Sequence, residues 1–414
     1  MNTETLHLHL DTDQNLVARE VPSQRVLEIS LQAPGSAAQT NRVPLNLALV
    51  LDRSGSMSGE KLEYVKRAAE HVLDLLHEQD MAAVVAYDDE INLLSPSVAV
   101  TGEQRSQLKR LISTLRPGGS TNLSGGWLAG CQEAAAAAAR VSSTGMLSRC
   151  LLLTDGLANV GITDLEALAV HARELSRRGV STSTFGVGEG FNEHLLEAIS
   201  NQGGGSFYYI ETPSEIPALF EREFKELAAV TAREIEIVLE FPANVSLQVL
   251  GGWVSEFSQG RLSISLGSMY ANKSQQIFIK VLTPPAAAAT DLKISARITG
   301  MDEAGLPFEA RAELAFQYTG LVSAEAAPKK REVLERFAQV DLAETANEAL
   351  KLERQGKRKQ ANKMLQQSIR ANAPHIAASQ AAEYQAISEK MQDGMTEADR
   401  KSSHYQAYNQ KRQR

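Results

Sequence analysis

The stretch from residue 44 to about residue 229 constrains the fold most, because short apolar runs alternate there with longer helical stretches. Strands that alternate with helices are typical of an α/β fold with a mostly parallel, doubly wound sheet. Two of the runs are apolar on both faces, as expected for strands that helices cover on either side. The predicted strands cover 45–51, 81–87, 150–153, 180–187 and 206–210, and the predicted helices cover 60–77, 103–115, 124–140, 165–178, 193–200 and 215–230.

Strand patterns of a different kind flank this region on both sides. Apolar and polar residues alternate from Leu6 to Leu10 and from Val26 to Leu31, and strand patterns return between residues 233 and 318. The later region predicts an antiparallel β-sandwich, whereas the N-terminal strands have no partners of their own. Because chains rarely leave strand edges open, we expect the N-terminal strands to pair with the later ones. The doubly wound domain would then be inserted into a discontinuous sandwich.

The C-terminal part is expected to be helical and chemically distinct. Residues 329–414 carry 17 Lys and Arg against 11 Asp and Glu, whereas the whole chain has a net charge of −8. Apolar residues at three- and four-residue spacing predict two helices with a break at Gln355 and Gly356. The predicted organisation is N-terminal strands of the sandwich at 1–42, the α/β domain at 43–230, the rest of the sandwich at 231–320, a helical hairpin region at 328–394 and a flexible tail at 395–414.

Composition excludes several classes of protein. Of the 414 residues, 43% are hydrophobic and 22% are charged, which is typical of a globular protein and not of a disordered or collagen-like chain. The negative net charge argues against general nucleic-acid binding. No apolar run reaches the length of about 18 residues that a membrane span needs. Two cysteines, Cys131 and Cys150, are too few for a disulfide framework, and the N-terminus lacks a signal-peptide pattern, so we expect a cytoplasmic protein.

The chemically informative segment is the junction between the first strand of the α/β domain and its first helix. There Asp52, Ser54 and Ser56 form a D-x-S-x-S pattern directly after a buried strand. The carboxyl edge of an open α/β sheet is where such folds bind ligands. One carboxylate and two hydroxyls on a turn offer the hard oxygen ligands that suit Mg²⁺.

Two later loops are expected to reach the same edge of the sheet. Thr121 lies in a glycine-rich loop before a helix, and Asp155 follows the predicted strand 150–153. Taken singly, each of these residues could be an ordinary helix cap or turn residue. Five such residues, in order and on one sheet edge, favour a metal site instead.

These residues carry a resemblance to the von Willebrand factor type A domain. Asp52, Ser54 and Ser56 match the D-x-S-x-S element of that family's metal-ion-dependent adhesion site, Thr121 matches its second-loop threonine and Asp155 its third-loop aspartate. The resemblance covers roughly residues 43–230. The sequence segments around the five positions resemble those of the bacterial members of the family and of its inter-alpha-inhibitor heavy-chain-like branch.

The resemblance implies a Rossmann-like fold with a bound Mg²⁺, or Mn²⁺ or Ca²⁺ in its place. In that family the hydroxyls ligate the ion, the carboxylates act directly or through water, and an Asp or Glu of a partner protein often completes the coordination. Among bacterial members it further implies partners such as AAA+ ATPases, kinases or phosphatases. We therefore expect a metal-dependent protein-binding module and not an enzyme.

Two alternatives stay open. The first is a structural or assembly protein in which the metal only stabilises the fold. The second is a serine hydrolase, because residues 55–59 satisfy G-x-S-x-G with Ser58 as the nucleophile. Its acid and base candidates are Asp155 or Asp164 and His171 or His194. The strand ends too early to place Ser58 on a nucleophile elbow, His171 falls inside a predicted helix, and no HGGG-like oxyanion loop precedes the motif.

Overall fold

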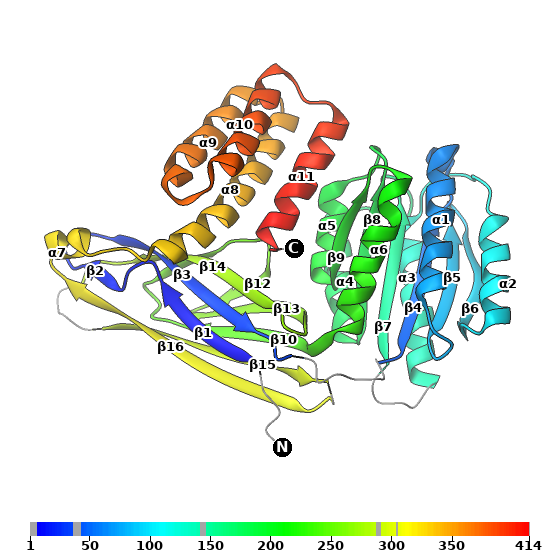
Figure 1. Cartoon of the computed structure of the whole chain (residues 1–414), viewed down its shortest axis with the longest axis horizontal. Helices are drawn as coiled ribbons and strands as arrows, with labels where there is room; N and C mark the ends of the chain where they lie inside the picture. Colours follow the sequence, from blue (N-terminus) through cyan, green and yellow to red (C-terminus); the bar gives the residue numbers. More distant parts are fainter. Residues whose placement is uncertain (1–5, 36–42, 141–145, 287–290, 304, 414) are drawn as a thin grey trace. The chain divides into compact units, whose positions relative to one another are not determined.

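Figure 1 shows the computed structural model of the chain, which describes residues 6–35, 43–140, 146–286, 291–303 and 305–413. The chain divides into two units. Residues 36–230 form one unit, and residues 1–35 together with 231–414 form the other, which is therefore discontinuous in sequence. Each unit has its own sheets and is described by itself below.

Among the described residues, a six-stranded sheet forms the centre of the unit at 36–230. Its strand order is β6-β5-β4-β7-β8-β9, and neighbouring strands are parallel except for β5 and β6. This confirms the mostly parallel, doubly wound sheet that the sequence predicts. The strands are β4 (Leu45–Asp52), β5 (Met81–Tyr87), β6 (Ile91–Ala99), β7 (Leu147–Thr154), β8 (Val180–Val187) and β9 (Gly204–Ile210).

Strand β6 was not predicted from the sequence. It pairs antiparallel with β5 at the edge of the sheet, and most of its residues stay at least partly exposed. It also carries Pro96, which lacks an N–H donor and is tolerated in edge strands. Because neither face of this strand is fully covered, its apolar residues do not form the continuous run that marks the central strands.

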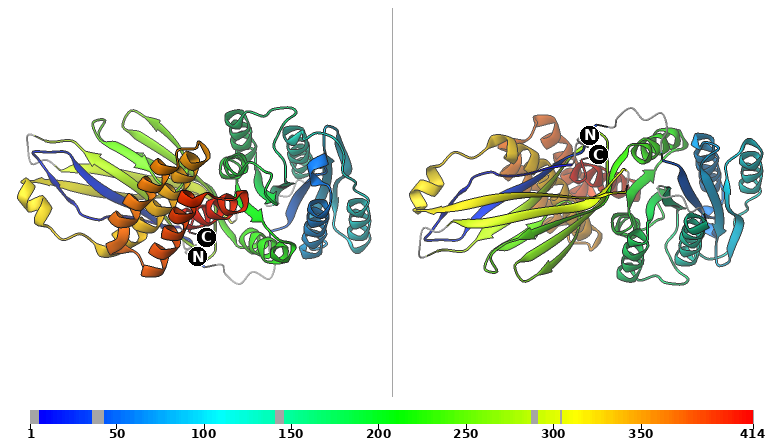
Figure 2. Two further views of the ribbon diagram at one scale, coloured as in Figure 1. Left: turned by 90° about the horizontal axis from the view of Figure 1, so that it is seen from above. Right: turned by 90° about the horizontal axis from the view of Figure 1, so that it is seen from below.

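Helices cover both faces of this sheet (Figure 2), and β4 is buried along its whole length. Helix α3 lies close to the sheet at two of its glycines. A Cβ at Gly126 would lie 2.4 Å from the ring of Tyr87, and one at Gly130 would lie 2.2 Å from Cγ2 of Val50. The helical elements are η1 (Gly55–Met57), α1 (Glu60–Leu75), α2 (Gly102–Ser113), α3 (Leu123–Arg140), α4 (Leu165–Arg177), α5 (Glu193–Gln202), η2 (Pro213–Glu215) and α6 (Ile216–Ala228).

A buried ion pair joins α6 to three strands of the sheet. Nη1 of Arg149 lies 2.5 Å from Oε1 of Glu223, and the two side chains are 1% and 0% exposed. Ser183 on β8 and Tyr208 on β9 each donate a hydrogen bond of 2.6 Å to the same carboxylate. Burial alone would raise the pKa of Glu223, but the charge of Arg149 and these hydrogen bonds lower it below its ordinary value. The carboxylate is therefore charged and fully paired.

The described strands of the other unit form two sheets, of order β1-β3-β14-β11 and β12-β13-β10-β15-β16-β2. Strand β3 pairs antiparallel with β14 over ten residues, and β2 pairs parallel with β16. The N-terminal strands thus pair with the later strands, as expected, and the α/β unit is inserted between them. The strands are β1 (His7–Thr12), β2 (Leu16–Ala18), β3 (Ser23–Gln32), β10 (Val230–Glu240), β11 (Ser246–Val249), β12 (Val254–Ser258), β13 (Arg261–Tyr270), β14 (Ser274–Thr283), β15 (Leu292–Asp302) and β16 (Pro307–Thr319).

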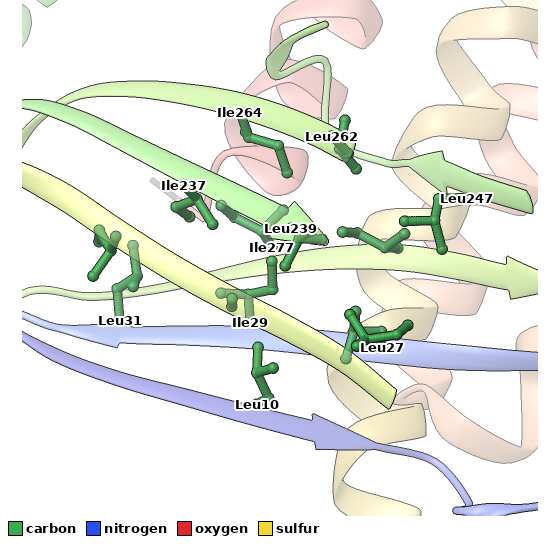
Figure 3. Close-up of a cluster of buried hydrophobic side chains, with 14 of the residues drawn as sticks. Leu10, Leu27, Ile29, Leu31, Ile237, Leu239, Leu247, Leu262, Ile264 and Ile277 are labelled. Carbon is green, nitrogen blue, oxygen red and sulfur yellow. The ribbon is translucent and has the colours of Figure 1, made fainter. Parts of the chain in front are cut away.

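Aliphatic side chains from both sheets fill the space between them (Figure 3). Leu27 and Ile29 of β3 and Ile277 of β14 come from one sheet, while Ile237 and Ile264 come from the other, and all five are fully buried. They occupy alternate positions along their strands, because successive side chains of a strand point to opposite faces. The shared core explains why the N-terminal strands fold with residues more than 200 positions away.

Helices follow the sandwich. They are α7 (Leu321–Ala326), α8 (Arg331–Arg354), α9 (Arg358–Asn372), η3 (Ala373–His375), α10 (Ala378–Asp393) and α11 (Glu397–Lys411). Arg336 of α8 fixes this helix to the sandwich through a bidentate ion pair with Glu28 of β3, with distances of 2.8 and 2.7 Å. None of the helices in the described residues is long and apolar enough to cross a membrane.

The prediction of a flexible tail at 395–414 is wrong for the described residues. Residues 397–411 form α11, which packs against α8 and buries Ala407 and Tyr408. Arg400 donates two hydrogen bonds, of 2.7 and 2.8 Å, to the buried carboxylate of Glu353. The helix was missed because polar contacts and two apolar residues hold it, and such a helix shows little apolar periodicity.

Replacing Glu223 by Gln is expected to destabilise the α/β unit by about 3–5 kcal/mol, because the buried charge of Arg149 would lose its negatively charged partner. Urea unfolding followed by circular dichroism measures this change. Glu221→Gln, at an exposed position of the same helix, is the matched control and should change stability by less than about 0.5 kcal/mol. Equal effects of the two substitutions would contradict the assignment of this pair as a main support of the unit.

The start of α11 should show a pH-dependent stability. Hydrogen bonds from Lys390 and Thr396 lower the pKa of Asp399 from 3.8 to about 2. A lowered folded-state pKa stabilises the protein above the unfolded value, and this contribution is lost as the pH falls through the folded value. The difference in unfolding free energy between the wild type and Asp399→Asn should therefore be constant near neutral pH and shrink between about pH 4 and pH 2. A difference that does not change over this range would show that the charge of Asp399 is not what stabilises the helix.

Candidate metal centre

Asp52 is the last residue of β4, and its position follows from the burial of that strand. All eight residues of β4 are buried. Its one carboxylate belongs to the last of them, at the point where the strand leaves the sheet. Oδ1 of Asp52 accepts a hydrogen bond of 2.8 Å from the amide of Ser54, and Oδ2 accepts one of 2.5 Å from the hydroxyl of Thr154. Burial raises the pKa of Asp52, and the negative charge of Asp155 raises it further.

The two serines of the D-x-S-x-S pattern connect β4 with the loop after β7. Oγ of Ser54 lies 3.1 Å from Oγ of Ser56, and Ser56 donates a hydrogen bond of 2.8 Å to Oδ1 of Asp155. Asp52, Ser54 and Asp155 are almost completely buried, whereas Ser56 is exposed. Both carboxylates of the cluster are therefore buried, whereas Ser56 reaches solvent.

Thr121 lies beside Asp52 at this same edge. A Cβ built on Gly156 would lie 3.2 Å from Oγ1 of Thr121 and 3.3 Å from Oδ2 of Asp52, so the missing side chain leaves room for both oxygens. The loop that carries Thr121 is fixed by Asn159, whose side-chain oxygen accepts a 2.8 Å hydrogen bond from the amide of Thr121. The structure thus brings together Asp52, Ser54, Ser56, Thr121 and Asp155, the five residues that the sequence predicts as metal ligands.

Two residues of the site were not predicted. Thr154 donates a hydrogen bond to Asp52, and the ammonium of Lys61 forms an ion pair with Oδ2 of Asp155. Thr154 directly precedes Asp155, so its place at the strand end was a usable signal. Lys61 lies in the first turn of α1, five residues after Ser56, and nothing in the sequence relates it to Asp155.

The loops around the cluster hold one another through their backbones. The amide of Gly55 donates a 2.8 Å hydrogen bond to the carbonyl of Gly119, and the amide of Gly118 donates one of 2.7 Å to the carbonyl of Arg53. Gly118 lies against Asp88 and Gly119 against Asp89, and at each of these two glycines a Cβ would meet a carboxylate oxygen at less than 2 Å. The D-x-S-x-S loop and the loop before Thr121 therefore form one supported surface.

The donor set fits a hard divalent cation. Two carboxylates and three hydroxyls offer only oxygen ligands, which Mg²⁺, Mn²⁺ and Ca²⁺ prefer. Two buried carboxylates, of which Asp155 alone pairs with the ammonium of Lys61, leave a net negative charge at the edge of the sheet, which a divalent cation would offset. The room over Gly156 lies between two of the candidate ligands.

The side chains of the hydrolase alternative have other partners. The hydroxyl of Ser58 donates a 2.8 Å hydrogen bond to the carbonyl of Gly55, and Asp164 accepts one of 2.8 Å from the amide of Ala167 as the cap of α4. Both oxygens of Asp155 accept hydrogen bonds from Ser56 and Lys61. None of these hydrogen bonds joins Ser58 to Asp155 or Asp164.

Comparison with known proteins identifies the family of the α/β unit. Residues 46–222 match the model of the von Willebrand factor type A domain. The uncharacterized protein sll0103 of Synechocystis sp. is 34% identical over 239 residues, which are 58% of this chain and 54% of that protein. YfbK of Escherichia coli is 33% identical over 217 residues, which are 52% of this chain and 35% of that protein.

Human inter-alpha-trypsin inhibitor heavy chain H3 is a more distant relative. It is 26% identical over 230 residues, which are 55% of this chain and 26% of that protein. This chain therefore spans about half, or less, of the length of these three relatives.

Two solved structures resemble nearly the whole chain. A von Willebrand factor type A protein from Catenulispora acidiphila has a TM-score of 0.73 at 16% identity and covers 98% of each chain. The ArnB paralog VWA2 from Sulfolobus acidocaldarius has a TM-score of 0.63 at 16% identity and covers 99% of this chain and 98% of its own. At this identity the likeness shows the fold alone. The family match and the sheet topology together show that residues 46–222 form a von Willebrand factor type A domain.

Proposed function

We propose that this chain is a protein-binding module that uses a divalent cation to capture an acidic residue of a partner protein. The hydroxyls of Ser54, Ser56 and Thr121 would hold the ion, and Asp52 and Asp155 would act directly or through water. Mg²⁺ is the expected ion, with Mn²⁺ and Ca²⁺ as its closest substitutes. An ion with few direct carboxylate ligands keeps enough positive charge to attract a carboxylate from outside.

The observation that supports this proposal is a series of hydrogen bonds that links four of the proposed metal ligands. The amide of Ser54 donates to Asp52 at 2.8 Å, the hydroxyls of Ser54 and Ser56 lie 3.1 Å apart, and the hydroxyl of Ser56 donates to Asp155 at 2.8 Å. This series of hydrogen bonds passes from a buried carboxylate to the exposed hydroxyl of Ser56, so an ion held there would be open to solvent on one side. An approaching carboxylate would meet the ion from that side.

The role of the protein residues is to position the donors before a partner arrives. Thr154 and the amide of Ser54 orient the carboxylate of Asp52, while Asn159 holds the loop of Thr121. Donors that are already held in place need little reordering on binding, which favours affinity. This arrangement fits a binding module better than an enzyme, and domains of this family typically mediate protein–protein interactions.

The partner and the location are further parts of the proposal. A protein with an exposed Asp or Glu is the expected partner, and AAA+ ATPases, kinases and phosphatases are the classes that the family resemblance suggests. A cytoplasmic location is supported by Cys131 and Cys150, which are both free and buried. Reduced thiols are ordinary in that compartment.

Replacing Asp52 by Asn should weaken Mg²⁺ binding by about 10–100-fold, since the substitution removes a charge but keeps the size of the side chain. Isothermal titration calorimetry measures the affinity. Mg²⁺ at about 100 times its dissociation constant should also raise the unfolding free energy of the wild type by about 2.7 kcal/mol. At the same Mg²⁺ concentration, the increase in Asp52→Asn should fall to about 0.4–1.4 kcal/mol, because the ion is then only about 1–10 times its dissociation constant.

Ser58→Ala is the matched control for this measurement. It removes a hydroxyl from the same loop. That hydroxyl donates a hydrogen bond to the carbonyl of Gly55 and not to any of the proposed metal ligands. Its Mg²⁺ affinity should equal that of the wild type. If Ser58→Ala weakened Mg²⁺ binding as much as Asp52→Asn, the proposed ligand set would be wrong.

Partner binding should depend on the ion and on its ligands in the same way. A pull-down from native lysate, in Mg²⁺ and in EDTA, would compare the wild type with the Asp52→Ala/Ser54→Ala double variant. Partners captured by the wild type in Mg²⁺ should be lost in EDTA and lost with the double variant. Partners retained in both cases would favour a structural or assembly role in which the metal only stabilises the fold.

A further inference from the structure

Lys61 is the positively charged group of the cluster. It lies in the first turn of α1, and its ammonium pairs with Oδ2 of Asp155 and lies 3.4 Å from the carbonyl of Ser56. The side chain of Asp155 is fully buried, whereas that of Lys61 is 34% exposed. The ammonium therefore reaches the buried carboxylate from the side of the solvent.

The loop after β8 lies along the stem of Lys61. A Cβ at Gly188 would lie 3.3 Å from Cε of Lys61, and one at Gly190 would lie 3.8 Å from its Nζ. Gly188 has a φ of +67°, a backbone conformation that glycine adopts most readily. The missing side chains leave room beside this loop for the side chain of Lys61.

Each oxygen of Asp155 already has a donor. Ser56 donates to Oδ1 at 2.8 Å, and Lys61 donates to Oδ2. Because each carboxylate oxygen has two lone pairs, a divalent cation that binds Asp155 directly either displaces one of these donors or lies beside it. A cation that binds through water still lies near the ammonium, and two positive charges at close range repel each other.

We propose that Lys61 is a built-in counter-cation that stabilises the carboxylate pair when no ion is bound and competes with the divalent ion for Asp155. This inference rests on the proposed function, because it concerns the same five ligands. The competition lowers the affinity for the ion and makes binding displace or strain the Lys61 side chain. Since the stem of that side chain lies next to Gly188 and its ammonium lies near Gly190, ion binding would also change the packing of the loop after β8.

Lys61→Met tests the competition, because it keeps an unbranched apolar stem and removes the charge. Its affinity for Mn²⁺, measured by electron paramagnetic resonance, is expected to exceed that of the wild type by about tenfold, from a positive charge removed at short range. In EDTA the variant should unfold at a lower temperature than the wild type. Saturating Mn²⁺ should remove most of that difference, because the ion then offsets the charge of the carboxylates.

Lys109→Met is the matched control. Lys109 forms a 2.6 Å ion pair with Asp74, and its side chain is 32% exposed, nearly the same as that of Lys61. The control removes one surface charge from the unit but none from the cluster, and its Mn²⁺ affinity should equal that of the wild type.

Lys61→Gln provides a second neutral variant that still donates hydrogen bonds, and Lys61→Arg retains the charge and should bind Mn²⁺ like the wild type.

The outcomes separate this inference from the proposed function. A wild type that binds Mn²⁺, with Lys61→Met and Lys61→Gln binding no more tightly than Lys109→Met, would overturn the role of Lys61 alone. Weaker binding by both neutral variants would overturn it as well and make Lys61 a positioning residue for Asp155. If neither the wild type nor any variant bound Mn²⁺ or Mg²⁺, both the metal centre and the competition with it would be wrong.

Discussion

The burial of β4 on both faces is the constraint on which the rest of the α/β unit depends. An unpaired charge inside a strand that helices cover on either side would be costly, and the one carboxylate of β4 belongs to its last residue. Parallel pairing then sets what lies next to it. Leu51 of β4 is in register with Leu153 of β7, so that Asp52 lies beside Thr154 and close to Asp155. The two carboxylates come together because of the register of two buried strands.

The charged side chains near the two ends of β7 differ in how completely they are paired. Near its start, Arg149 and Glu223 are buried, paired and joined by hydrogen bonds from Ser183 and Tyr208. Beyond its end, Asp155 and its neighbour Asp52 have one ammonium between them and an open side at Ser56. A fully satisfied polar cluster specifies one structure, whereas a partly neutralised one is suited to binding a cation. The first stabilises the domain, and we propose that the second gives it its function.

Much of the fold could be predicted because most central elements have a strong local pattern. The apolar runs predicted β4, β5, β7, β8 and β9, and the open edges of the N-terminal strands predicted the discontinuous sandwich. The missed elements lack such a pattern. Strand β6 is exposed at a sheet edge, and α11 is held by contacts such as the one between Arg400 and Glu353, which are 47 residues apart.

The sequence by itself determined the type of sheet, the place of insertion and the order of five oxygen-bearing residues in or next to the loops at one edge of the sheet. These features depend on short-range periodicity and on the kinds of side chain that follow a buried strand. Only the tertiary structure decided how those residues are held. Thr154 reaches Asp52 across 102 residues and Lys61 reaches Asp155 across 94, and neither separation leaves a local signal. Contacts of this kind depend on strand register and on helix packing, which arise only when the chain has folded around its buried core.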